Sequence, residues 1–261
     1  MADFSGDDVE AEEYANNSDI EFTSDHPETV DGLYAHDDLV ARNEALNLAK
    51  IQGGVFLDPD RGAVWRPGLN HILSRVHPPS MPGNPNFSFH ISSIRVLASL
   101  ADDIVSILYP DMTVGAKAGK RALFLVEDVG FAVRTNFPFH LAKFALSEFT
   151  KAISRVDNGS DPQLMIDVQV VTTVLESQEL LAPMYEPRMP IALAAVVDYV
   201  LAEIIELAGN VTRDRKAAQI KPADIYKAIH NDEELQNLFQ SAIIPGGGVI
   251  PNIHPVLVPR K

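Results

Sequence analysis

Hydrophobic residues recur at helical spacing, every three or four positions, in two long stretches of the chain. In the first stretch, the residues on one face are Ile94, Leu97, Leu100, Ala101, Ile104, Val105 and Leu108. The second stretch should run from Pro190 to about Arg213, and its stripe consists of Leu193, Val196, Val197, Val200, Leu201, Ile204, Leu207, Ala208 and Val211. Each stripe predicts a long helix that buries one face in a core.

Shorter segments with the same periodicity flank each long one. Around the first they are Trp65–Val76, Leu125–Thr135 and His140–Val156, and around the second they are 164–176, Pro222–Ile229 and 232–239. A polar linker, Asp157–Pro162, separates the two sets. The order short, long, short therefore occurs twice, with no convincing strand between the elements, which predicts an all-α protein.

Three local signals predict where helices begin, bend or end. Ser92-Ser93 offers an N-cap to the first long helix. Pro110 lies inside that helix, where a proline removes a backbone donor, so we expect the second half of the helix to bend or fray. Upstream, Asp58-Pro59-Asp60 should interrupt the chain before the first short helix.

One set of three helices cannot close its own core, because a long helix with two short arms leaves apolar surface on both sides. We expect the two long helices to pack across each other, so that each set completes the core of the other. The linker makes this association intramolecular, at an effective concentration on the order of millimolar.

Charge is distributed unevenly along the chain. The net charge is −15, and residues 1–41 contain 13 acidic side chains but no Lys or Arg. The remaining residues carry 23 acids against 21 bases, so an acidic segment precedes a nearly neutral body. Residues 1–36 have the composition of a disordered tail, and residues 37–51 fit one short amphipathic helix.

Several function classes lack their characteristic motifs. Without Cys, the chain has no disulfides, no thiolate zinc sites and no thiol nucleophiles. Gly246-Gly247-Gly248 is not followed by the Lys-Ser/Thr of a phosphate loop, and neither a Gly-x-Ser-x-Gly nor a His-Glu-x-x-His motif occurs. No window approaches 18 uncharged apolar residues, so we expect no membrane-spanning helix, and the acidic N-terminus argues against a secretory signal. We therefore expect a protein that is not an enzyme and binds no cofactor, metal or membrane.

Three strings in the C-terminal half resemble the 2A core histones closely. They are LAAVVDYVLAEIIELAGN (Leu193–Asn210), NDEEL (Asn231–Leu235) and GGVIPNIHPVLVPRK (Gly247–Lys261). Residues 61–157 resemble the 2B core histones more loosely, through SRVHP (Ser74–Pro78), DDIVSIL (Asp102–Leu108), GKR (Gly119–Arg121) and LAKFALSEFTKAI (Leu141–Ile153). Together they look like the fused histone doublets of Marseillevirus-like giant viruses.

The resemblance implies a domain organisation and a set of partners. Residues 1–60 would be an acidic tail, 61–157 a 2B-like histone fold and 158–261 a 2A-like histone fold, packed as an intramolecular handshake dimer. This pair would bind a histone 3–histone 4-type doublet or tetramer, with a second copy of itself in an octamer-like particle around DNA. The region Phe124–Phe139 would contact the histone 4-type fold. The docking segment would include Gly247, Val249, Pro251, Asn252 and Ile253.

In this family DNA is bound by paired loops, helix N-termini and arginines. The residues at corresponding positions are Lys117, Lys120, Arg121, Arg188, Arg213, Arg215 and Lys216. Departures from the family weaken the expectation, because Val156–Pro187 contains no Lys or Arg and Gln219 stands where the family has a minor-groove arginine. Each lost phosphate contact lowers DNA affinity, so we expect weaker wrapping than in an ordinary histone dimer.

The family also has an acidic patch that receives arginine anchors from chromatin proteins. The matching residues here are Asp198, Glu203, Glu206, Asp232, Glu233, Glu234 and Glu148, while His140 replaces one further family acid. An ordinary solvated acidic face is the alternative interpretation.

Two functions remain open at this point. The first is a structural chromatin protein that packages viral DNA and is located in the virion and in the host nucleus or viral factory. The second is an acidic, chaperone-like protein that sequesters basic histone partners. A histone-fold transcription subunit is a third alternative. The acidic tail either solubilises the chain or mimics DNA.

Overall fold

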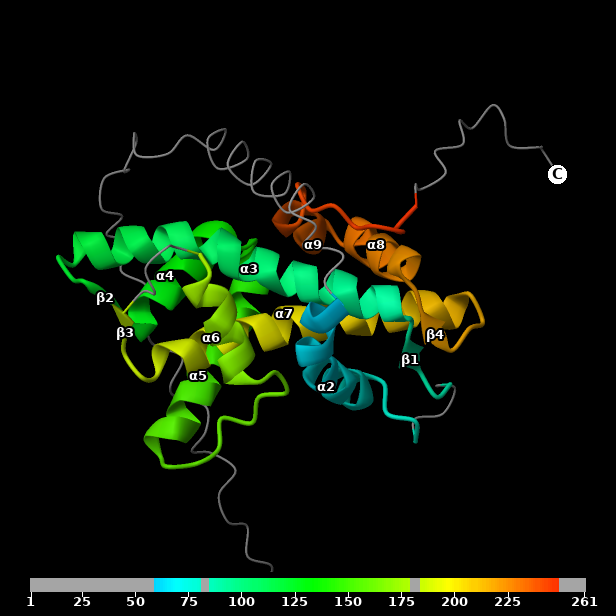
Figure 1. Cartoon of the computed structure of the whole chain (residues 1–261), viewed down its shortest axis with the longest axis horizontal. Helices are drawn as coiled ribbons and strands as arrows, with labels where there is room; N and C mark the ends of the chain where they lie inside the picture. The colour runs from blue at the N-terminus through cyan, green and yellow to red at the C-terminus, as the bar shows by residue number, and fades with distance from the viewer. Residues whose placement is uncertain (1–58, 81–84, 179–183, 249–261) are drawn as a thin grey trace, which may run out of the picture. The chain divides into compact units, whose positions relative to one another are not determined.

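The computed structural model describes residues 59–80, 85–178 and 184–248, all of which belong to the unit Val40–Lys261. The expected all-α architecture is confirmed, with four two-residue strands in the loops (Figure 1). The first set of elements is α2 (Pro59–Val76), β1 (Ser88–Phe89), α3 (Ile91–Ala118), β2 (Leu123–Phe124), α4 (Val126–Asn136) and α5 (Phe139–Asp157). The second set is α6 (Val168–Glu176), β3 (Met184–Tyr185), α7 (Met189–Asp214), β4 (Gln219–Ile220), α8 (Pro222–Asn231) and α9 (Glu233–Leu238).

The strands of the two sets, and the helices α4 and α8 that follow the second strand of each set, repeat at an offset of 96 residues. Ser88 and Met184 begin their strands at this spacing, as do Leu123 and Gln219. The strands pair between the sets, because β1 runs parallel to β4 and β2 runs parallel to β3. The paired strands lie at opposite ends of α3 in Figure 1. We call them the β1–β4 end and the β2–β3 end.

The core is a single cluster to which both sets contribute. Helix α2 packs on both α3 and α7, and so do α4, α6 and α8. The largest fully buried side chains come from both long helices and from the short ones: Trp65, Leu69, Ile72, Leu97, Leu100, Ile104, Leu108, Met112, Leu175, Met189, Leu193 and Leu201. Burying such side chains on both sides of each long helix supplies the main stabilisation, at about 25 cal/mol per Å² of apolar surface.

The N-cap prediction for the first long helix was wrong by two residues. His90 caps α3, because its Nδ1 accepts a hydrogen bond from the backbone N–H of Ser92 at 3.2 Å. Ser93 is already inside the helix, and its hydroxyl donates to the backbone oxygen of Ile220 at 2.8 Å. That bond fastens the start of α3 to the strand β4 of the other set.

Fraying of α3 at Pro110 and an interruption of the chain at Pro59 were both expected from the sequence, and both predictions were wrong. Helix α3 does not fray at Pro110. It is 28 residues long and continues past the proline to Ala118, because Met112 and Ala116 are buried in the core. Pro59 does not interrupt the chain but begins α2, where a proline at the first position lacks only an N–H that the helix does not use.

Helix α6 begins later than the expected residue 164. Asp167 is its N-cap and accepts a hydrogen bond from the N–H of Gln169 at 2.8 Å. Residues 164–167 instead form an extended approach that contacts α7 through Asp198. The predicted tail, the helix at 37–51 and the residues from Val249 onward lie outside the described residues.

Candidate nucleic-acid interface and acidic surface

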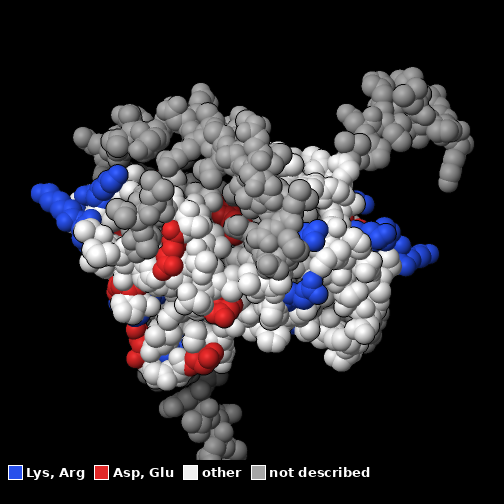
Figure 2. All heavy atoms as spheres, in the orientation of Figure 1, with Lys and Arg blue, Asp and Glu red and all other residues white. Residues whose placement is uncertain are grey.

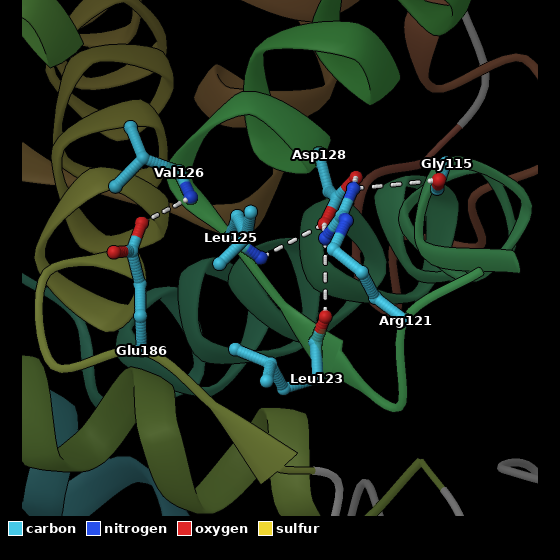
Figure 3. Close-up of polar contacts among 7 residues, drawn as sticks. All are labelled: Gly115, Arg121, Leu123, Leu125, Val126, Asp128 and Glu186. Carbon is cyan, nitrogen blue, oxygen red and sulfur yellow. Dashed lines mark hydrogen bonds and ion pairs between the residues drawn. The ribbon is translucent and has the colours of Figure 1, made fainter. Parts of the chain in front are cut away.

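Arg121 and Asp128 form a hydrogen-bonded ion pair beside the β2–β3 end, and we call such a pair an arginine clamp. Both terminal nitrogens of Arg121 donate to Asp128, at 2.7 and 2.8 Å, and Nη1 also donates to the backbone oxygen of Leu123 (Figure 3). Asp128 accepts a further hydrogen bond from the N–H of Leu125 and is almost fully buried. These donors hold the pKa of Asp128 below its usual range despite burial, which by itself raises it.

A second arginine clamp lies at the β1–β4 end, where Arg215 follows Arg121 by 94 residues and Asp224 follows Asp128 by 96. Arg215 donates to Asp224 at 3.0 and 2.6 Å and to the backbone oxygen of Gln219, while Asp224 accepts from the N–H of Lys221. Here too the pKa of the buried aspartate lies below its ordinary value, although burial opposes that shift. Two arginines predicted to bind DNA, Arg121 and Arg215, are thus tied to carboxylates of their own chain.

Arg188 is also paired within the chain. Its guanidinium lies 3.1 Å from Asp157 and 3.4 Å from Glu186. The other oxygen of the Glu186 carboxylate accepts a hydrogen bond from the N–H of Val126, the first residue of α4, at 2.7 Å (Figure 3). Glu186 therefore stands between a helix N-terminus and the one arginine of its loop.

The remaining predicted DNA-binding cations are exposed. Lys117 closes α3, and Lys120 and Lys216 occupy equivalent turns with φ of 51° and 56°. Arg213 is exposed at the end of α7, where its Nη2 donates to Nδ1 of His77 at 3.2 Å. The Nε2 of the same buried imidazole is 2.9 Å from the backbone oxygen of Glu206. His77 thereby joins the end of α2 to α7.

Sequence reasoning missed two cations at the β1–β4 end. Arg95 and Lys221 line a cavity of about 520 Å³, together with His90, Ser92 and Pro222. Arg95 follows the first turn of α3 by one residue, and Lys221 is the N-cap residue of α8. Their positions beside two helix N-termini were the signal available in the sequence, because such positions favour anions.

Four of the seven predicted acidic-patch residues lie around one cavity of about 590 Å³. They are Glu148 on α5 and Asp198, Glu203 and Glu206 on α7. Arg75 and Arg155 also line the cavity, so its wall is of mixed charge. Burial, and then the nearby Glu206, Asp232 and Glu234, raise the pKa of Glu203.

Asp198 is the member of this set that does not reach the surface. It is 8% exposed, and its Oδ1 accepts hydrogen bonds from the N–H groups of Met165 and Ile166 at 3.1 and 3.0 Å. Burial raises the pKa of Asp198 to about 6, opposed by these two bonds and by Arg75. Asp198 therefore fixes the segment 164–167, which precedes α6, to α7. The resemblance to the family had indicated only a place in the acidic patch.

The remaining acids belong to α9 and the residue before it. Asp232 caps α9 by accepting from the N–H of Leu235, and Glu233 is exposed. Glu234 accepts hydrogen bonds from the N–H groups of His140 and Leu141 at 3.0 and 2.7 Å, and so caps α5 from the other set. These hydrogen bonds lower the pKa of Glu234 although partial burial raises it.

Of the predicted docking residues, the structure describes only Gly247. It is buried, and a Cβ added there would lie 2.9 Å from the Cβ of Tyr226 on α8, so the backbone lies against that helix. Val249, Pro251, Asn252 and Ile253 lie outside the described residues.

Two searches within the described ranges gave negative results. No group of three or more His, Cys, Asp or Glu among these residues is arranged to hold a metal ion. Nor does any helix in the described part of the chain have the length and apolar character needed to cross a membrane.

The C-terminal part of the chain is similar to 2A histones. Residues 233–261 match the family described as the C-terminus of histone H2A. The chain is 51% identical over 77 residues to a probable histone H2A.5 of Arabidopsis thaliana, covering 30% of this chain and 51% of the relative. It is 53% identical over 72 residues to histone H2A.1 of Solanum lycopersicum and 54% identical over 72 residues to a histone H2A of Chlamydomonas reinhardtii, in each case over 28% of this chain and 49% or 56% of the relative.

The chain thus spans about half the length of the curated relatives it matches. The matches support a place for it among the core histones.

Proposed function

We propose that this chain is a structural chromatin protein, a fused histone doublet whose two sets of helices form a 2B–2A-type pair within one polypeptide. The observation that carries the proposal is the similarity of its C-terminal part to histone H2A, at more than 50% identity over 72 to 77 residues. Its role would be to pair with a histone 3–histone 4-type partner and help package DNA in nucleosome-like particles, in a virion and in a host nucleus or viral factory.

The architecture supports an intramolecular pair. The 96-residue offset of the strands, the exchanged strand pairs and the shared core are what two similar units would form if each completed the other. Separate units with private cores would leave the apolar faces of α3 and α7 unburied. The linker 158–167, fixed by Asp198, would join the halves at short range.

Partner contacts would come from three surfaces. The C-terminal segment that begins near Gly247 would lie along the histone 3–histone 4-type partner. The exposed Phe131 on α4 would contribute to the neighbouring four-helix contact. The acids Glu148, Glu203, Glu206 and Glu233 would receive arginine anchors of chromatin proteins, with Asp232 and Glu234 holding α9 in place behind them.

Charge favours a second candidate function. Arg121, Arg188 and Arg215 are paired with carboxylates of this chain, and the whole chain carries a net charge of −15. A protein with few available cations binds phosphate weakly. The alternative is therefore a chaperone-like protein that removes basic histone partners from DNA.

One experiment separates these functions. Fluorescently labelled DNA carrying a histone 3–histone 4-type tetramer is titrated with the chain at physiological salt, and the species are resolved by sedimentation velocity. Packaging predicts one faster species that contains DNA, partner and chain. Release of free DNA, with partner and chain sedimenting together, would support sequestration and contradict the packaging function.

A further inference from the structure

The two ends at which the strands pair carry different charge balances. At the β1–β4 end, residues 85–95 and 213–224 contain five basic and two acidic side chains. At the β2–β3 end, residues 115–128 and 184–188 contain four basic and three acidic ones, and Asp157 adds a fourth acid by pairing with Arg188. On the face seen in Figure 2, basic side chains protrude at both ends, and the acidic ones gather on the half that carries β2 and β3.

One position of the repeat contributes one charge to this difference. Glu186 in the second set corresponds to His90 in the first, 96 residues earlier, and both donate their N–H to equivalent strands, to Phe124 and Ile220 respectively, at 2.9 Å. The Glu186 carboxylate accepts the N–H of Val126 at the start of α4. The equivalent of Val126 is Pro222, which has no N–H to offer.

At the β2–β3 end the positions suited to a phosphate are therefore occupied. A carboxylate at a helix N-terminus accepts the same N–H donors and the same favourable dipole that a phosphate oxygen would use. Glu186 also forms an ion pair with Arg188, and Asp157 forms a second ion pair with the same guanidinium. Within the described residues, only Lys117 and Lys120 remain at this end without an ion pair to an acidic side chain.

At the β1–β4 end the position equivalent to Glu186 carries no carboxylate, because His90 occupies it. The cavity of about 520 Å³ beside the start of α3 has Arg95 and Lys221 in its wall, and neither has an ion-pair partner among the described residues. His90 closes the helix N-terminus with a ring nitrogen rather than a carboxylate, so no negative charge competes there.

Building on the function proposed above, we propose that Glu186 and Asp157 take the place of DNA phosphates at the β2–β3 end, so that this chain holds DNA mainly through Arg95 and Lys221 at the β1–β4 end. DNA binding is one-sided because carboxylates of the chain itself occupy the phosphate-binding positions at the β2–β3 end. One-sided binding requires that the chain binds DNA, as proposed above.

The test compares two variants that remove the same charge. Glu186→Gln with Asp157→Asn frees Arg188 while keeping an oxygen that accepts the Val126 N–H. Glu176→Gln with Asp161→Asn is the matched control, because these acids bond Tyr185 and the Gln163 N–H and touch neither Arg188 nor α4. Affinity of the full chain for a short DNA duplex is measured by fluorescence anisotropy at several salt concentrations.

The first pair should bind on the order of tenfold more tightly at low salt, with a log–log salt slope steeper by about one to two units, since each new phosphate contact adds about one. The control pair should change the slope little. Equal effects of the two pairs would overturn the proposal, because bulk charge would then explain the gain.

A second comparison shows which end of the chain contributes more to DNA affinity. In the unmodified chain, Arg95→Gln with Lys221→Gln should weaken binding several-fold more than Lys117→Gln with Lys120→Gln, and the second pair should matter only once Glu186 and Asp157 are neutralised. Equal losses from both pairs in the unmodified chain would refute one-sided binding. Absence of DNA binding by every version of the chain would contradict the proposed function itself, and this inference with it.

Discussion

Asp128 and Asp224 are buried aspartates, and each holds an arginine and the start of a helix in place. Each carboxylate accepts hydrogen bonds from two nitrogens of an arginine, and it caps the helix on which it lies by accepting the N–H of Leu125 or Lys221. The arginine in turn reaches a strand carbonyl in the preceding loop. A residue that could have met DNA is thereby used to set the geometry of the loop.

Replacing either aspartate should destabilise the fold. Asp224→Ala and Asp128→Ala should each lower the free energy of unfolding by about 3 kcal/mol, because a buried carboxylate that pairs with an arginine and caps a helix is lost. The measurement is urea denaturation followed by circular dichroism. Asp161→Ala, which removes an exposed acid of the linker, serves as the control and should cost under about 1 kcal/mol. Equal losses of unfolding free energy in all three variants would show that the two arginine clamps stabilise the fold no more than an exposed acid does.

Asp198 should give the stability a pH dependence of the opposite sign to the clamps. Its pKa is raised to about 6 in the folded chain, so the native state takes up a proton before the unfolded chain does. The free energy of unfolding should therefore gain about 1–2 kcal/mol from this group as pH falls from 7 to 5. Asp128 and Asp224, with lowered pKa values, contribute stability that is lost only at more acidic pH, below the ordinary range of a carboxyl.

The variant Asp198→Asn isolates this contribution. Its amide oxygen can still accept the N–H groups of Met165 and Ile166, and it cannot ionise. The difference in stability between the unmodified chain and the variant should shift in favour of the unmodified chain between pH 7 and pH 5, measured by urea denaturation at each pH. A difference that does not vary with pH would contradict a raised pKa at Asp198.

At the scale of elements, the periodic stripes predicted every helix of the described residues, although α2 begins six residues earlier and α6 four residues later than expected. The two misses within α3 share one cause. Local signals at Ser92 and Pro110 were outweighed by tertiary packing, in the first case by the bond of Ser93 to Ile220 and in the second by the burial of Met112 beyond the proline. Propensity describes an isolated helix, whereas α3 is held along its length by α2, α4, α7 and α8.

The continuous helix predicts a gain in stability when Pro110 is replaced. Pro110→Ala supplies the missing N–H for the carbonyl of Ser106 and should raise the free energy of unfolding by about 1–3 kcal/mol. Pro222→Ala is the control, because Pro222 begins α8, where a proline fits and its ring is buried, so no gain is expected there. Thermal unfolding compares the two variants, and a loss of stability in Pro110→Ala would mean that α3 depends on the proline.

At the scale of the whole molecule, the sequence predicted the repeated order of helices and the need for a shared core. It did not predict how the cations would be used. Arg121 and Asp128 are seven residues apart and Arg215 and Asp224 nine apart, and in each pair the arginine precedes the helix that carries the aspartate, so helical periodicity does not indicate the contact. Glu186 meets Val126 across 60 residues, and that bond depends on the pairing of strands between the two sets, which no local pattern encodes. An aspartate at the third position of α4 and of α8 was the one available signal.

The charge of the molecule then determines how strongly it can act on DNA. Three of the seven predicted DNA-binding residues are paired within the chain, and the end that remains basic has two cations that the sequence comparison did not select. A packaging role therefore depends on the histone 3–histone 4-type partner for most of the phosphate contacts, with this chain extending the particle.

Nuclease protection tests that account most directly. A particle is reconstituted from this chain, DNA and a histone 3–histone 4-type partner at physiological salt, and it is digested beside the partner and DNA alone. The account predicts a discrete protected fragment longer than the one that the partner protects by itself. A fragment of the same length, or loss of protection when the chain is added, would contradict a packaging function.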